Sequence, residues 1–125
     1  MEIANSPKPP YYAVVFTSLK SDSDDGYNKM SERMLELVKK QPGFLGFESA
    51  RNELVSSKGM SSRNKTSFGG ITISYWKDLE SINNWKNNSE HILAQKSGKD
   101  IWYNSYKVRI CKVERDYIFE QKHNS

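Results

Sequence analysis

The sequence predicts an α+β domain of the ferredoxin-like type, with the element order β-α-β-β-α-β. Two observations lead to this class. The chain has 125 residues, which is enough for one domain with its own core and too few for two. Apolar, β-branched runs alternate with helix-like periodicity in that order, without an internal repeat. In such a fold an antiparallel sheet carries both helices on one face.

The first strand is predicted at residues 11–19, where a nearly unbroken apolar and β-branched run is typical of a strand covered on both faces. The segment before it, residues 1–10, contains three prolines and is expected to be a flexible lead-in. A single domain is predicted over residues 11–119, followed by a tail at 120–125. Because two helices cover only one side of the sheet, a second copy is the simplest cover for the other side, and we expect a homodimer.

The first helix follows a polar, acidic turn. Asp24 or Asp25 is expected to cap its beginning, and Gln41-Pro42-Gly43 to end it. The residues that recur at helical spacing are Tyr27, Met30, Met34, Leu37 and Val38.

The second and third strands are predicted at residues 44–53 and 71–76, joined by a long Ser-rich connection over residues 54–67. Gly46 inside the second strand indicates a bulge. The pair Gly69-Gly70 precedes the third strand, so the two strands should form a wide hairpin.

The second helix is expected to begin after Asp78 as its cap. Asn87-Asn88 should loosen it, so that Ser89 caps a continuation that ends at Gly98. The last strand is expected to run from Tyr103 or Tyr106 to Phe119. One face of the helix is shared by Leu79, Ile82 and Trp85.

Composition argues against several classes of function. The net charge is +4, but the Lys and Arg residues are spread along the chain without a basic arm, so we do not expect nucleic-acid binding. No apolar stretch approaches the roughly 20 residues that span a bilayer, so no membrane insertion is expected. The single Cys111 and the absence of a leader pattern point to a cytoplasmic protein. His91 and His123 do not supply a three-ligand site, so no metal is expected.

Several short motifs resemble the antibiotic biosynthesis monooxygenase superfamily, in the same order and with similar spacing. The resemblance covers about Tyr11 to Phe119 and is greatest to a small bacterial branch of undefined activity. It implies a dimeric α+β barrel in which two sheets pack face to face and each subunit keeps a pocket between its helices and sheet. The motifs are Gln41-Pro42-Gly43-Phe44-Leu45-Gly46-Phe47-Glu48, Ser74-Tyr75-Trp76 with Asp78 and Trp85, Ser89-Glu90-His91 with Ala94-Gln95, and Trp102-Tyr103-Asn104-Ser105-Tyr106.

The superfamily contains cofactor-free oxygenases of aromatic polyketides, haem-degrading enzymes and members without known catalysis, so the fold does not fix the function. Haem-degrading relatives use an Asn on the first strand, a Trp on the second helix and a later His. Only Trp85 matches, because the first strand offers Phe16, Thr17 and Ser18, and His91 comes several residues early. The resemblance therefore implies no haem, and no cofactor is expected.

His91 is the predicted catalytic base for oxygenation of a phenol-like substrate. If Ser89 caps its helix, His91 lies in the first turn, where the helix dipole helps to keep the imidazole neutral and able to accept a proton. The alternative is a half-exposed histidine that only bonds to neighbouring backbone.

Four further residues are predicted to bind the substrate: Trp85, Tyr75, Tyr106 and Arg109. Trp85 forms either a pocket wall or ordinary core packing. Tyr75 and Tyr106 are phenols that can donate to a ligand oxygen, and Arg109 either holds an anionic group or makes an ordinary salt bridge. Two hypotheses follow: a cofactor-independent monooxygenase acting on a small aromatic or polyketide-like substrate, or a non-catalytic dimer that binds a small apolar ligand.

Overall fold

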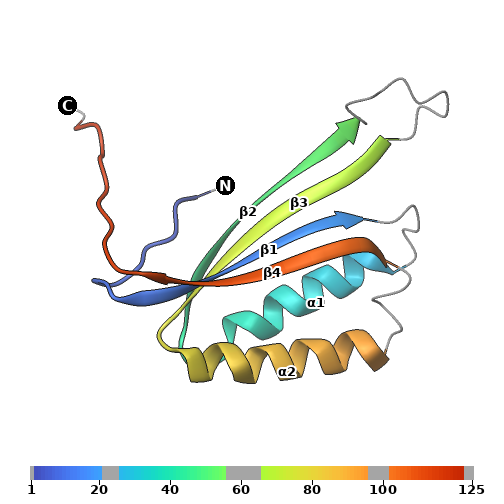
Figure 1. The fold of residues 1–125 in the computed structure, drawn as a ribbon, viewed down its shortest axis with the longest axis horizontal. Helices are drawn as coiled ribbons and strands as arrows, with labels where there is room; N and C mark the ends of the chain where they lie inside the picture. The colour runs from blue at the N-terminus through green and yellow to red at the C-terminus, as the bar shows by residue number, and fades with distance from the viewer. Residues whose placement is uncertain (1, 21–25, 56–65, 96–101, 123–125) are drawn as a thin grey trace.

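The computed structural model describes residues 2–20, 26–55, 66–95 and 102–122. Its four strands form one antiparallel sheet in the order β2-β3-β1-β4, and both helices lie on the same side of it (Figure 1). The α+β, ferredoxin-like prediction is confirmed. The elements are β1 (Tyr11–Lys20), α1 (Tyr27–Lys39), β2 (Phe44–Val55), β3 (Thr66–Trp76), α2 (Leu79–Gln95) and β4 (Tyr103–Val113).

The space between helices and sheet is filled by two aromatic-rich clusters. One joins α1 to the beginning of β4 through Tyr27, Met30 and Trp102. The other joins both helices to β3 through Val38, Trp76 and Ile82, and Trp76 is 0% exposed. Trp76 and Trp102 are therefore core residues.

The register of the strands determines which side chains face the helices. Paired residues on adjacent strands project to the same face, and neighbours along a strand project to opposite faces. Val14 packs on the helix cluster, so Ile110, its partner on β4, also lies on the helix side. Ala13 and its partner Tyr75 project to the opposite side, which we call the helix-free face.

The beginning of α1 differs from the prediction. Its N-cap is Gly26, which has a positive φ of 74° and makes no side-chain capping bond, so neither Asp24 nor Asp25 is the cap. Glycine suits this position because a left-handed conformation is costly for residues that carry a Cβ. The end agrees with the prediction, since the Lys40 and Gln41 amides bond back to the last turn and Pro42 follows.

The second helix begins as predicted but is not divided. The Ser81 amide donates a 2.8 Å hydrogen bond to the Asp78 carboxylate. The hydrogen bond from the Ser81 hydroxyl, and then this amide, hold the pKa of that carboxyl below its usual range. The helix then continues through Asn87 and Asn88 without a break. Ser89 is not a cap, because its hydroxyl donates to the Lys86 carbonyl one turn earlier. Packing of the apolar face outweighs the weak helix preference of asparagine here.

The hairpin of β2 and β3 is longer than expected, since pairing extends to Val55 and Thr66. Part of the predicted connection is therefore strand, and residues 56–65 lie outside the described residues. The bulge predicted at Gly46 is confirmed by a register shift between Phe44 and Gly46.

The last strand is shorter than expected, because β4 ends at Val113 and not at Phe119. Val113 pairs with Tyr11, the first residue of β1. The two residues before Tyr11 are prolines, which have no N–H to extend a ladder, so the chain beyond Val113 has no strand to pair with.

Candidate functional site

A partly exposed aromatic surface lies on the helix side of β1 and β4. Phe16 stacks on Tyr106 with centroids 5.2 Å apart and meets Tyr103 edge-on at 5.8 Å. Val108 pairs with Phe16 and therefore shares its face. Val108 and Ile110 remain 47% and 52% exposed, so the helices leave this part of the sheet open. We call the five residues Phe16, Tyr103, Tyr106, Val108 and Ile110 the helix-side patch.

One end of the helix-side patch is closed by Tyr27 of α1, which lies edge-on to Tyr103 at 6.1 Å. Burial raises the pKa of Tyr103 above its ordinary value, and the adjacent Tyr27 adds to this effect. Two cations lie against Tyr27: the Lys20 ammonium and the Arg51 guanidinium are each 5.0 Å from its ring centroid. The patch therefore combines apolar walls with protonated phenols and positive charge at one end.

Trp85 lies next to this surface. Its half-buried indole stacks on Trp76 at 6.5 Å and packs against the same cluster as Val14. The core-packing interpretation of Trp85 is thus present in the structure. Trp85 can also form a wall beside the helix-side patch. Val14, which packs against the same cluster as Trp85, lies two residues before Phe16 on the same face of β1.

His91 is exposed and lies near the end of α2, not in its first turn. The first-turn argument depended on Ser89 as a cap and is therefore wrong. His91 follows the buried Ile82 by nine positions, which is about two and a half helical turns, so the two side chains leave α2 on opposite sides. The structure does not bring His91 together with Trp85 or Tyr106.

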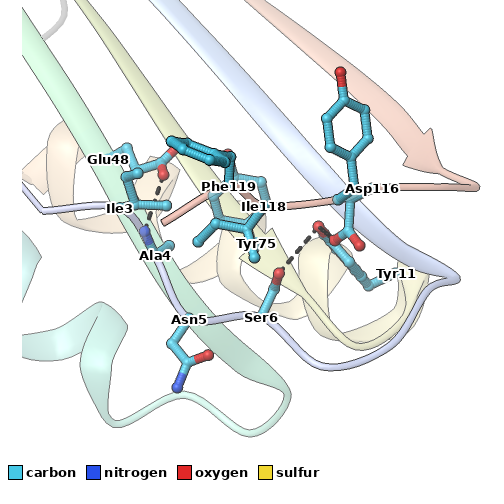
Figure 2. A pocket seen from close by; sticks show the side chains of 11 residues that line it. Ile3, Ala4, Asn5, Ser6, Tyr11, Glu48, Tyr75, Asp116, Ile118 and Phe119 are labelled. Carbon is cyan, nitrogen blue, oxygen red and sulfur yellow. Dashed lines mark hydrogen bonds between the residues drawn. The ribbon is translucent and has the colours of Figure 1, made fainter. Parts of the chain in front are cut away.

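A pocket, which we call the terminal pocket, lies on the helix-free face. It has a volume of about 430 Å³ and is lined by residues 3–6 and 116–119 together with Tyr11, Glu48 and Tyr75 (Figure 2). Tyr75 donates a 2.6 Å hydrogen bond to Glu48 Oε1, and the Ala4 amide donates to Oε2 at 2.9 Å. Burial and the neighbouring Glu48 carboxylate raise the pKa of Tyr75.

Both chain ends are fastened to the sheet at this pocket. The Tyr11 hydroxyl donates to Asp116 at 2.5 Å and accepts a 3.0 Å hydrogen bond from Ser6. Burial raises the pKa of Tyr11, and the hydrogen bond to Asp116 adds to it. The lead-in, which we expected to pack little, thus lies against the sheet.

The predicted binding residues are therefore divided between two faces. Trp85 and Tyr106 belong to the helix side, whereas Tyr75 and Arg109 project to the helix-free face, where Arg109 pairs with Val15. Cys111 pairs with Ala13, so it is also on the helix-free face, and it is exposed.

Sequence reasoning missed Val108 and Ile110, although a signal for them is present. Apolar or aromatic residues at Tyr106, Val108 and Ile110 alternate with Lys107 and Arg109, and this period of two marks one apolar face of a strand.

Comparison with known proteins settles the family. The family model of the antibiotic biosynthesis monooxygenases matches residues 10–97. The chain belongs to this family. The chain is also 42% identical to the uncharacterized protein YqjZ of Bacillus subtilis (strain 168) over 122 residues, which cover 98% of this chain and 96% of that protein.

Solved structures share the fold of this monooxygenase-family chain. SnoaB, a cofactor-independent oxygenase from Streptomyces nogalater, is 12% identical, with a TM-score of 0.61 over 90% of this chain and all of SnoaB. A dimeric ferredoxin-like protein from an uncultured marine organism is 14% identical, with a TM-score of 0.57 over 87% of this chain and 100% of that one. Neither described helix is long and apolar enough to cross a membrane.

Proposed function

We propose that the protein is a cofactor-independent monooxygenase that acts on a small aromatic or polyketide-like substrate held at the helix-side patch. The observation that carries this proposal is the exposure of Val108 and Ile110 beside the Phe16–Tyr106 stack. An apolar surface edged by aromatic rings fits one face of a flat ring system. Family membership adds support.

The reaction needs no external reductant, because the substrate supplies the electrons. The methylene carbon of an anthrone-type ring system, the keto tautomer of a phenol, loses a proton, and the resulting anion reduces dioxygen. One oxygen atom becomes a carbonyl on that carbon, and the other leaves as water with the two hydrogens that the carbon has lost. The protein's part is to orient the flat substrate, exclude water from one of its faces and assist proton removal.

His91 remains our candidate for the base. Because His91 is exposed on the side of α2 away from the buried Ile82, the proton must pass to it from the helix-side patch through water. The same exposure makes His91→Ala a clean test, since no core contact is lost with the side chain.

We propose that the working form is a homodimer joined through the helix-free face. This face exposes Ile71 and Leu19 in the single chain, and a second sheet would cover them. The dimeric ferredoxin-like protein of similar fold supports the proposal of a dimer. Sedimentation at micromolar concentration should therefore show a dimer.

Oxygen uptake with an anthrone as the probe tests the enzymatic proposal, after subtraction of the rate without protein. We expect His91→Ala to lower uptake by about 10²-fold or more while leaving affinity within a few-fold, the usual contribution of a general base. Unchanged uptake in His91→Ala would reject His91 as the base and leave the oxygenase proposal standing.

The alternative function is a non-catalytic binding protein, and the exposure of His91 is the observation that favours it. If anthrones and related phenols bind to the wild-type protein but none drives oxygen uptake, the binding function is correct and the oxygenase proposal fails. Affinity is measured by quenching of tryptophan fluorescence.

A further inference from the structure

The strand pairing places Arg51 on the helix side of the sheet. Arg51 on β2 pairs with Gly70 on β3, which pairs in turn with Ser18 on β1. Ser18 pairs with Tyr106 on β4. The four residues occupy one row and therefore project to one face of the sheet. Because Tyr106 stacks on Phe16 there, the side chain of Arg51 shares the face of the helix-side patch.

Gly70 allows the arginine to lie across the sheet. A Cβ at this glycine would lie 3.2 Å from Arg51 Cγ and 3.9 Å from its Nε, so the arginine occupies space that a side chain on β3 would fill. The guanidinium leans from edge strand β2 toward β1 and ends 5.0 Å from the centroid of the Tyr27 ring. Arg51 therefore reaches the end of the helix-side patch that Tyr27 closes.

A second cation and a buried phenol lie at the same end. The Lys20 ammonium is also 5.0 Å from the Tyr27 centroid, so both positive charges lie against one ring. Tyr103, a member of the patch, meets Tyr27 edge-on at 6.1 Å. Burial and then Tyr27 raise the pKa of Tyr103, whereas the charge of Arg51 acts in the opposite direction. Arg51 is thus close enough to act on a patch residue.

The Arg51 guanidinium is available to a ligand. Its side chain is exposed, and within the part of the chain that the structure describes it contacts the Tyr27 ring and no carboxylate. The patch continues away from this end as an apolar surface to Val108 and Ile110. A guanidinium presents a planar fork of N–H donors that matches a carboxylate, and an ammonium adds a point charge. This arrangement suits a planar acid group attached to an apolar ring.

We propose that Arg51, with Lys20, binds a carboxylate on the substrate, so that the helix-side patch selects flat aromatic acids over neutral rings. This rests on the proposed function and deepens it by naming the substrate class. The ring system lies on Phe16 and Tyr106, and the carboxylate lies at the Tyr27 end. The acid group then fixes which end of the substrate points toward α1, and oxygenation of one particular carbon requires such a fixed orientation. Arg51 acts on specificity and takes no part in the oxidation.

Two probes of the same shape separate the effect of charge from binding of the ring. Anthracene-2-carboxylate and anthracene-2-carboxamide differ in charge, and neither has the acidic methylene of an anthrone, so affinity is measured without turnover. Quenching of tryptophan fluorescence gives both dissociation constants. The wild-type protein should bind the acid about tenfold or more tightly than the amide, as expected for a charge-assisted pair, and high salt should reduce this preference.

Replacement of the arginine tests its role. Arg51→Gln should weaken binding of the acid by roughly tenfold or more and change the affinity for the amide by less than about threefold. Arg51→Lys keeps the charge but loses the fork, so its affinity for the acid should lie between those of the wild type and Arg51→Gln. Arg33→Gln removes an exposed arginine from α1 and should leave both affinities unchanged.

The outcomes separate this inference from the proposed function. Equal affinity of the wild type for the two probes would overturn the inference and leave a neutral substrate for the oxygenase. An equal loss of both affinities in Arg51→Gln would also overturn it, because the arginine would then act only by packing against Tyr27. If neither probe binds, the inference fails, and if in addition no anthrone drives oxygen uptake, the proposed function fails with it.

Circular dichroism checks that each variant is folded. If Arg51→Gln does not fold, the salt dependence of the wild-type preference and the affinities of Arg51→Lys decide the question. A preference for the acid that salt does not change would reject the ion pair.

Discussion

The indole of Trp85 stacks on the indole of Trp76, with ring centroids 6.5 Å apart and planes inclined by 25°. Trp76 is the last residue of β3 and fully buried, whereas Trp85 comes from α2 and is half-buried. The contact therefore fastens the second helix to the sheet. Phe44 meets Trp76 edge-on at 5.4 Å, so the rings of Phe44, Trp76 and Trp85 pack together at this contact.

Replacement of Trp85 by alanine should lower the free energy of unfolding by about 2–3 kcal/mol, below the range for fully buried tryptophan because part of the ring is already in water. Trp85→Phe keeps a ring at the stack and should cost about 1 kcal/mol. Urea unfolding followed by circular dichroism measures both. The control Lys86→Ala, exposed on the same helix, should stay within about 0.5 kcal/mol. Equal effects of Trp85→Ala and Lys86→Ala would contradict the stacking role.

Two glycines with positive φ should respond differently to alanine. Gly43 has a φ of 82°, and a Cβ there would lie 2.1 Å from the Ser81 hydroxyl oxygen, whereas at Gly26, with a φ of 74°, it would lie 3.6 Å from Trp102. Gly26→Ala should cost only the left-handed penalty, about 1–2 kcal/mol. Gly43→Ala should cost at least 1 kcal/mol more by our estimate, because α2 must also move. Thermal unfolding of the two variants provides the comparison. Equal losses of stability in the two variants would show that α2 moves away from the new Cβ at no measurable cost.

The order of the elements was predictable because each carries its own local signal. The unbroken apolar run of residues 11–19 identified a buried strand, and Asp78 identified the beginning of α2. The extent of β4 was not predictable, since it depends on where its partner begins. Val113 is the last residue with a partner because Tyr11 follows Pro9 and Pro10, a relationship between the two ends of the chain.

The candidate site was less predictable, because strand register decides which face a side chain joins. Tyr75 and Tyr106 are similar as residues, but register places Tyr75 on the helix-free face and Tyr106 beside Phe16. The prediction that His91 lies in the first turn of a helix failed at an earlier step. Asn87 and Asn88 indicate a break in isolation, yet the helix continues through them, which moves His91 out of a first turn.

Tyr75 should make stability fall at high pH. Its pKa is raised in the folded state, first by burial and then by the Glu48 carboxylate that accepts its hydrogen bond. The folded chain therefore binds this proton more tightly than the unfolded chain. The resulting stability is fully present below about pH 10, the unfolded value, and is lost as the pH rises toward the folded value. Urea unfolding between about pH 8 and 11 should show a shallower decline in Tyr75→Phe than in the wild type.

Tyr117→Phe is the control for that decline, because Tyr117 is almost fully exposed and lies on the same side of the sheet. It should keep the wild-type dependence on pH. An identical slope in Tyr75→Phe and Tyr117→Phe would show that the Tyr75–Glu48 hydrogen bond does not carry the effect.

Two nearly equally exposed apolar side chains should separate self-association from ligand binding. Ile71 is 46% exposed on the helix-free face, and Val108 is 47% exposed on the helix side. Ile71→Lys places a charge in the proposed dimer interface and should weaken the dimer by roughly tenfold or more, as for an unpaired charge in an interface. Val108→Lys should leave the dimer intact and weaken the binding of an anthrone by a similar factor, because the charge lies against the Phe16 and Tyr106 rings.

Sedimentation measures the dimer dissociation constant of both variants, and fluorescence quenching measures their affinity for the anthrone. If Ile71→Lys weakens anthrone binding and Val108→Lys dissociates the dimer, the assignment of the two faces is reversed. If Val108→Lys leaves anthrone affinity unchanged, the helix-side patch is not the binding surface.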